Sequence, residues 1–210
     1  VNLVWFEGTA QMVLAYAALY YSCIAGLVIT VDSLGREKRE GTLGLLFLTG
    51  LSGGEIILGK WMVGALRVGY GLLAAGPALA VCFALGGVEG MTVVQVMIGL
   101  LVAVAFSMAL GVWIAAVAAG SERLGGIVTL IVPLFLMGMP AVSWWLRDEW
   151  NAPVVALTLD LFSPATPIRA VFHPPPGAPA SLFIDAVLGN LATTLALLWL
   201  AGRTLERNWH

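Results

Sequence analysis

The sequence predicts an all-α, polytopic membrane protein with five transmembrane helices. Of its 210 residues, 60% are hydrophobic and only 10% are charged, whereas soluble domains average roughly 45–50% apolar and about 25% charged residues. The charged residues also leave five long charge-free runs, which together hold 117 residues. A soluble enzyme, a DNA-binding domain and a disordered tail are therefore excluded, and the net charge of −2 provides no basic footprint for nucleic acid.

The charge-free runs set the expected order of the helices. A helix that crosses the bilayer needs about 20 mostly apolar residues, and the runs cover residues 8–31, 68–88, 90–121, 124–146 and 186–202. We expect transmembrane helices at about 8–31, 61–86, 91–120, 124–146 and 184–202, all in one transmembrane domain that covers 1–210. Two long connections, 32–60 and 147–183, lie between them. No carboxylate falls inside a run, which argues against an ion-coupled transporter.

The third run carries small residues at every fourth position. Residues four apart lie on one face of a helix, and small side chains there allow a second helix to approach closely in a membrane. We therefore expect helix packing along the face formed by Ser107, Gly111, Ala115 and Ala119.

The connection 147–183 is rich in proline. Seven of the ten prolines lie between 147 and 185, and the centre of this segment, Val154–Phe162, is apolar except for Asp160. Nine residues cannot cross a bilayer. We expect an interfacial or re-entrant segment followed by a rigid, Pro-rich turn.

The distribution of Lys and Arg predicts the orientation. If the segment 32–67, with its five basic residues, is cytoplasmic, eight of the ten basic residues lie in the cytoplasm and two, Arg147 and Arg169, lie outside. Cytoplasmic loops are enriched in Lys and Arg. The N-terminus of this chain is therefore predicted outside and the C-terminus in the cytoplasm.

The connection 32–60 has the most informative sequence. Five consecutive charges, Arg36–Glu40, are followed by a short apolar stretch, Leu43–Leu48, in which Leu43, Leu46 and Phe47 have helical spacing. Gly50 ends this stretch, and Ser52 precedes Glu55 by three residues, which is the capping-box arrangement that begins a helix. We expect a short helix along the cytoplasmic surface, then a turn, then the second transmembrane helix.

Two nucleotide-binding motifs are only approximated in this connection. Residues 51–55 resemble the signature sequence of ABC ATPases, and Gly54–Lys60 resembles a phosphate-binding P-loop. Trp61 stands where a P-loop has the Ser or Thr that holds magnesium, and no predicted strand precedes it. Nucleotide binding by this chain is therefore not expected.

The residues from Arg36 to Lys60 instead resemble the loop of ABC-type-2 transporter permeases. Gly76-Pro77 and Gly86-Gly87-Val88 extend the resemblance, which covers about 55 residues by motif. The family pattern has six transmembrane helices, so the five runs correspond to the second to sixth, and we expect the family's first span to be absent from this chain.

The resemblance also implies a mechanism and partners. The loop would contain a coupling helix that docks on a separate ATP-binding subunit, which would hold ATP and Mg, so this chain itself would be neither an enzyme nor a cofactor-binding protein. A second permease subunit, a homo- or heterodimer, a location in the bacterial inner membrane and export of an unidentified substrate are also implied. Carried over by position, the residues that shape or contact the coupling surface are Arg36, Glu37, Arg39, Glu40, Gly41, Thr42, Leu43, Leu46, Thr49, Leu51, Ser52 and Glu55.

The chain departs from the family pattern at Gly44, where an acidic residue is common, and at Gly50, where proline is common. A glycine in a helix interior costs up to about 1 kcal/mol, so both departures loosen the predicted coupling helix.

Other classes of membrane protein fit less well. Only His173 and His210 are present and both lie outside the runs, so an intramembrane Ser–His pair is not available. No His-Glu-x-x-His motif is present, and we predict neither catalytic residues nor a metal site. A non-transporting membrane anchor or assembly factor remains an alternative, because it would share this composition and could use the same loop for docking.

The predicted orientation can be tested by cysteine labelling in intact cells. A cysteine introduced between 170 and 180 should react with a membrane-impermeant reagent, and one at position 38 should not. Labelling at position 38 would contradict the orientation.

Overall fold

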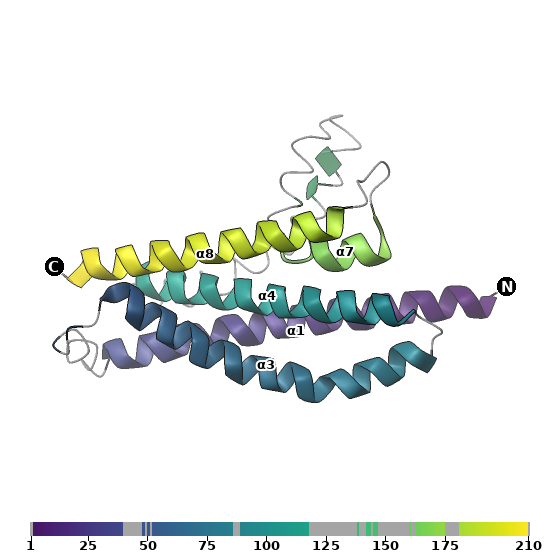
Figure 1. The fold of residues 1–210 in the computed structure, drawn as a ribbon, viewed down its shortest axis with the longest axis horizontal. Coiled ribbons are helices and arrows are strands. Elements are labelled where there is room, and N and C mark those ends of the chain that lie inside the picture. The colour runs from purple at the N-terminus through teal and green to yellow at the C-terminus, as the bar shows by residue number, and fades with distance from the viewer. Residues whose placement is uncertain are drawn as a thin grey trace.

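The chain folds into a bundle of helices (Figure 1). A computed structural model describes residues 2–39, 48, 50, 52–85, 89–117, 138, 142–143, 145–146, 160, 163–174 and 181–209. Among these residues every regular element is a helix, so the predicted all-α class is confirmed for the described part. The helices are α1 (Asn2–Arg39), α3 (Gly53–Leu85), α4 (Gly90–Val117), α7 (Thr166–Phe172) and α8 (Leu182–Trp209).

Three stretches within the described residues are long and apolar enough to cross a membrane. They are Met12–Val31 in α1, Gly90–Val117 in α4 and Leu182–Arg207 in α8, and they coincide with the first, third and fifth predicted transmembrane helices. The second predicted helix, 61–86, lies in α3. The fourth, 124–146, falls outside the described residues except at a few positions, so the number five stays a prediction.

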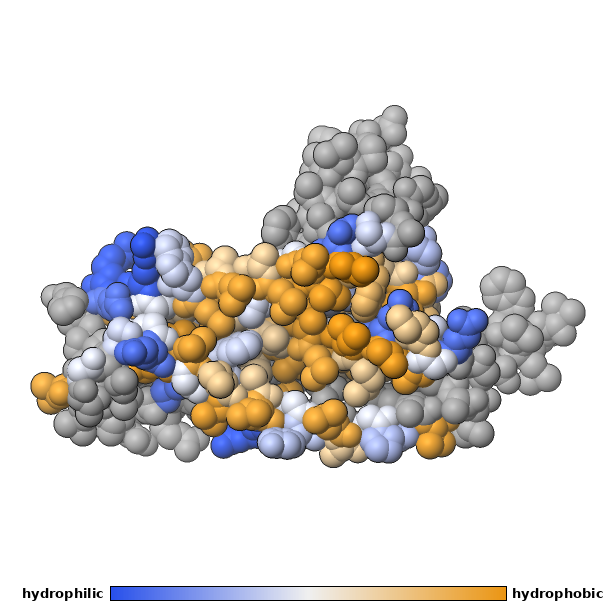
Figure 2. Space-filling model, viewed as in Figure 1, coloured by the Kyte–Doolittle hydropathy of each residue, from blue (hydrophilic) through white to orange (hydrophobic). Residues whose placement is uncertain are grey.

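The surface of the bundle is apolar along its length. Exposed side chains such as Leu188, Leu195 and Trp199 on α8 are hydrophobic. Figure 2 shows this apolar surface over the middle of the molecule, with hydrophilic side chains gathered at the end where α8 finishes. A soluble protein rarely exposes such a continuous apolar surface, whereas lipid chains would solvate it.

Helix α4 lies at the centre of the bundle. It contacts each of the other four described helices, and its side chains are mostly buried from Val96 to Ala116. Its sequence explains this position, because a helix that is hydrophobic on all sides is stable only when every side is covered by apolar neighbours.

Helices α1 and α4 approach each other closely at two glycines. A Cβ atom at Gly26 of α1 would lie 2.8 Å from the Ser107 hydroxyl, and one at Gly111 of α4 would overlap the Thr30 hydroxyl. Ser107 and Gly111 belong to the predicted small-residue face, and the helix that approaches them is α1 of the same chain. Ala115 lies instead in an apolar cluster with α8, and Ala119 lies outside the described residues.

The connection after the fourth predicted helix contains a buried short helix that was not predicted from the sequence. Ile168 of α7 is fully buried and packs on Gly99 of α4. Arg169 of α7 forms an ion pair of 2.5 Å with Asp160, which is 1% exposed, and Ser143 donates a hydrogen bond to the same carboxylate. This helix was not predicted because Pro167 and Arg169 interrupt the apolar pattern by which a helix is identified in the sequence.

The connection 32–60 is shorter than the charge pattern suggested. Residues 32–39 continue α1 and residues 53–60 form the first turns of α3. The predicted surface helix, Leu43–Leu48, lies outside the described residues except for Leu48, whose side chain is exposed. The charged residues that follow Val31 can be solvated while they remain helical, so α1 continues through them.

The close contact at Gly111 predicts a specific loss of stability. Thr30 donates a hydrogen bond of 2.6 Å to the Gly26 carbonyl, and the Leu27 carbonyl oxygen would lie 3.0 Å from a methyl group at Gly111, so the space for that group is blocked by stiff atoms. Gly111→Ala should lower the free energy of unfolding by about 1–3 kcal/mol. Gly71 on α3 has open space around it, and Gly71→Ala serves as the matched control. Denaturant titration of both variants in detergent checks this, and equal stability of the two would contradict it.

Candidate functional site

The candidate site is the end of the bundle where α1 ends, α3 begins and α8 ends. Arg36, Glu37 and Arg39 lie on the last turns of α1, of which the backbone is described. Ser52 and Glu55 lie at the start of α3. The remaining predicted coupling residues fall outside the described residues: Glu40, Gly41, Thr42, Leu43, Leu46, Thr49 and Leu51.

A complete capping box begins α3. The backbone N–H and the hydroxyl of Ser52 both donate to Glu55 Oε2, at 2.8 and 2.9 Å, and the Glu55 N–H donates to Ser52 Oγ at 3.3 Å. The predicted capping arrangement is therefore confirmed. It satisfies donors that the first turn of a helix would otherwise leave open.

The capping box also shifts the titration of Glu55. Hydrogen bonds from the backbone and the side chain of Ser52 hold the pKa of Glu55 below its usual value. A lowered carboxyl pKa means that the contribution to stability is present above the unfolded pKa and is lost as pH falls through the lowered, folded pKa. The box is therefore intact at neutral pH.

Gly50 has a backbone conformation that proline cannot adopt. Its φ is +79°, in the region that glycine enters without steric cost, whereas proline is fixed near −65°. The departure from the family pattern at this position thus matches the local turn that precedes α3.

The start of α3 is held against the end of α8. Glu206 on α8 accepts a hydrogen bond of 3.1 Å from the Gly53 N–H. A Cβ atom at Gly202 would lie 3.1 Å from the Gly54 Cα, and one at Gly53 would lie 3.0 Å from the Gly202 carbonyl oxygen. We call these four residues the α3–α8 joint. The carboxylate of Glu206 also complements the positive N-terminal end of the α3 dipole.

The joint explains the ABC-signature likeness of residues 51–55. Gly53 leaves little room for a Cβ atom against Gly202 and Glu206 of α8, whereas a Cβ atom at Gly54 would meet no atom within 4 Å. Ser52 and Glu55 form the capping box. Residues 54–60, which resembled a P-loop, are helical, so they cannot wrap around a phosphate. Gly202 and Glu206 could not be found from the sequence, because their partners lie about 150 residues away in the chain.

Apolar packing extends the joint into the centre of the bundle. Ile56 and Ile57 of α3 lie in one buried cluster with Leu205 of α8 and Val112 of α4. One turn further along, the Trp61 indole N–H donates a hydrogen bond of 3.1 Å to the Ala105 carbonyl of α4. The first three turns of α3 are thus attached to both α4 and α8.

The described side chains at this end of the bundle make structural contacts. Within the described residues no group of three His, Cys, Asp or Glu side chains is placed to hold a metal ion. The side chains present make caps, helix contacts and one hydrogen bond across the joint. The start of α3 is thereby connected to both α4 and α8.

Comparison with known families gives a clear match. The model of a family described as ABC-2 family transporter protein matches residues 8–200. The match covers all of α3, α4 and α7 and includes the capping box, whereas Gly202 and Glu206 lie just beyond it. No curated protein matches the sequence significantly.

The capping box predicts a local effect at the start of α3. Ser52→Ala removes a side-chain cap, which is worth about 1 kcal/mol, so amide hydrogen exchange of Ile56 and Ile57 should become about fivefold faster. Ser181 makes a comparable contact with Asp185 at the start of α8, and Ser181→Ala is the matched control that should leave α3 unchanged. Unaltered exchange in Ser52→Ala would show that tertiary contacts alone hold this turn.

Proposed function

Because the chain belongs to the ABC-2 transporter family, we propose that it is a permease subunit that a separate ATP-binding subunit drives through residues 32–60. ABC-2 permeases are multi-pass membrane components and not the catalytic subunits of their transporters. The finer features are part of the proposal: export as the direction of transport, ATP and Mg held by the partner, and a pair of permease subunits. A bacterial inner membrane, with the C-terminus and residues 32–60 in the cytoplasm, is part of it as well.

The observation that supports coupling through 32–60 is the α3–α8 joint. A partner that pushes on residues 40–52 acts on a segment that enters α3 through a capped first turn. That turn is fixed to α8 by Glu206 and by glycine contacts that leave little space. Because the first three turns of α3 also pack on α4, movement of the segment would shift helices in the bundle and would not be absorbed by a loose loop.

The length of α1 supports a docking role for the segment that follows it. Its apolar stretch ends at Val31 while the helix continues to Arg39, which adds eight residues, or about 12 Å, beyond the membrane-spanning stretch. The two helices that flank residues 40–52 therefore both project beyond the apolar part of the bundle. A docking surface between them would stand clear of the lipid.

The proposal is tested with the ATP-binding subunit encoded beside this chain, or with the one that co-purifies with it. The double substitution Glu40→Ala and Leu46→Ala should weaken binding of that subunit about tenfold or more, since truncation of central interface side chains costs over about 1 kcal/mol each. Glu89→Ala, which removes an exposed carboxylate beyond the opposite end of α3, is the matched control. Unchanged binding and unchanged ATPase stimulation in the double variant would contradict coupling through this loop.

A second variant separates docking from transmission. Gly202→Val places a branched side chain against Gly54 and should leave binding of the ATP-binding subunit intact while it lowers transport-coupled ATPase activity. A complex that binds but never couples, even in the wild-type protein, would favour the alternative of a non-transporting anchor or assembly factor.

A further inference from the structure

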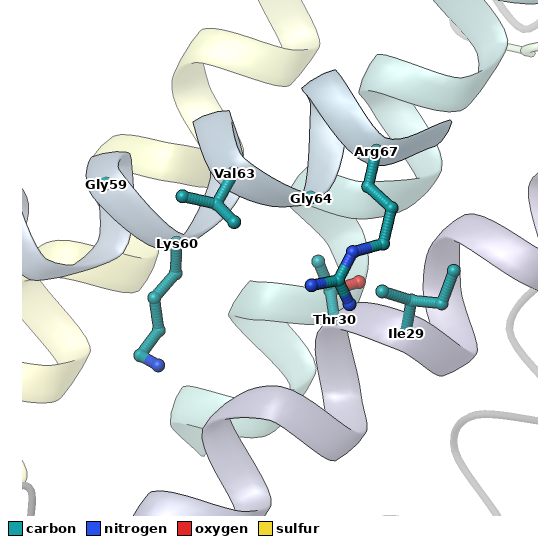
Figure 3. Close-up of a pocket in the computed structure, with 7 residues that line it drawn as sticks. All are labelled: Ile29, Thr30, Gly59, Lys60, Val63, Gly64 and Arg67. Atoms are coloured by element: carbon teal, nitrogen blue, oxygen red, sulfur yellow. The ribbon is translucent and has the colours of Figure 1, made fainter. Parts of the chain in front are cut away.

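A cavity lies between α1 and α3, beside the candidate site but separate from the α3–α8 joint. Its volume is about 210 Å³, and its lining includes Ile29 and Thr30 from α1 and Lys60, Val63 and Arg67 from α3. Figure 3 shows that Lys60 and Arg67 both project from α3 on the side where α1 lies, and that the Arg67 guanidinium reaches toward Thr30. The lining contains no Asp or Glu among the described residues, so these walls are apolar with two positive charges.

The cavity lies where the membrane surface crosses the bundle. The charge-free run of α1 ends at Val31, and that of α3 begins at Val68. These two ends meet in space, because a Cβ atom at Gly64 of α3 would lie 3.7 Å from the Thr30 side chain. Arg67 therefore stands at the edge of the hydrocarbon, and Lys60 lies seven residues away, about 10.5 Å along the helix, on the aqueous side. The headgroup layer of a leaflet is about 5–7 Å thick, so Arg67 would lie at its hydrocarbon side and Lys60 at its aqueous side.

We propose that this cavity binds the phosphate headgroup of an anionic phospholipid from the leaflet on the side of residues 32–60. Arginine matches the geometry of phosphate oxygens and lysine adds a second point charge. Among the described residues Arg67 has no ion-pair partner and its side chain is exposed, so a phosphate would supply the missing negative charge.

The size of the cavity and its apolar walls favour a lipid over a soluble anion. A volume of 210 Å³ corresponds to about seven water molecules at about 30 Å³ each, which accommodates a phosphate headgroup but not the acyl chains. Exposed apolar side chains continue from the cavity on both helices, including Val28 and Ile24 on α1 and Tyr70 and Leu73 on α3. They provide an apolar surface for the chains of the same lipid.

The proposal is tested by lipid binding to the purified chain, measured by native mass spectrometry after titration with phosphatidylglycerol or phosphatidylcholine. The wild-type protein should bind phosphatidylglycerol more tightly. Arg67→Gln should weaken that binding about fivefold, as the contribution of one basic side chain near an anionic surface implies, and should leave phosphatidylcholine unaffected. Arg207→Gln removes another exposed charge, at the end of α8, and should have no effect. Equal losses in both variants, or no preference for phosphatidylglycerol, would overturn the proposal.

A steric variant tests the cavity without a change in charge. Gly59 lines the cavity, and a Cβ atom placed there would have no other atom within 4 Å, so Gly59→Phe should fold and fill the space. It should reduce phosphatidylglycerol binding to the level of phosphatidylcholine. Gly71→Phe, at an equally open position of α3 outside the cavity, should bind as the wild type does. Full binding in Gly59→Phe would show that the lipid sits elsewhere.

A third arm distinguishes the source of the phosphate. Glycerol 3-phosphate carries the same charged group without acyl chains, and an excess of it should not displace bound phosphatidylglycerol. Displacement would assign the cavity to a soluble phosphate ester and overturn the lipid assignment. All three arms measure lipid occupancy and none measures ATPase activity, so their outcome is independent of the proposed coupling function.

Discussion

The burial of α4 is the constraint on which the rest of the bundle depends. Inside a membrane, apolar side chains gain nothing from leaving water, so helices associate through close packing and a few hydrogen bonds. Helix α4 meets this requirement with small residues, because α1 reaches its backbone at Ser107 and Gly111. The same helix receives the Trp61 indole of α3 and Ile168 of α7. Where α4 has a larger side chain, Met108, the facing positions of α1 and α3 are the glycines Gly26 and Gly64.

This arrangement gives the two ends of the bundle different kinds of support. At one end, α7 packs on α4, and Arg169, Asp160 and Ser143 form a buried polar group that joins three segments of the chain. A buried pair of this kind is costly to separate, because removal of one partner leaves an unpaired charge. At the other end, the α3–α8 joint consists of glycine contacts and one hydrogen bond at the surface of the bundle. The contacts near α7 thus depend on a charged pair, whereas those at the α3–α8 joint depend on glycines that let two helix backbones come close.

Much of the fold could be predicted from local sequence signals, and the remainder depends on distant residues. The charge-free runs located the apolar parts of α1, α4 and α8, and the spacing of Ser52 and Glu55 located the start of α3. Helix α7 could not be found this way, since it is short and begins beside Pro167. Asp160 looked like an interruption of an apolar stretch until Arg169 supplied its partner. The α3–α8 joint could not be predicted either, because no sequence motif around Glu206 indicates a contact with the distant Gly53.

The position of the glycines links the fold to the proposed function. Gly53 and Gly202 bring two helix backbones close together where α3 begins, so a side chain added at either of these two glycines must move one helix relative to the other. Helices that touch through their backbones move together, whereas helices separated by long side chains can shift while those side chains repack. A displacement of residues 40–52 would therefore reach α8 with little loss, and it would reach α4 through the apolar cluster at the start of α3. At the opposite end of α4, α7 packs on Gly99, and Arg169 of α7 is held by its ion pair with Asp160. Under the proposed function, α4 is thus the element on which force from one end meets a fixed support at the other.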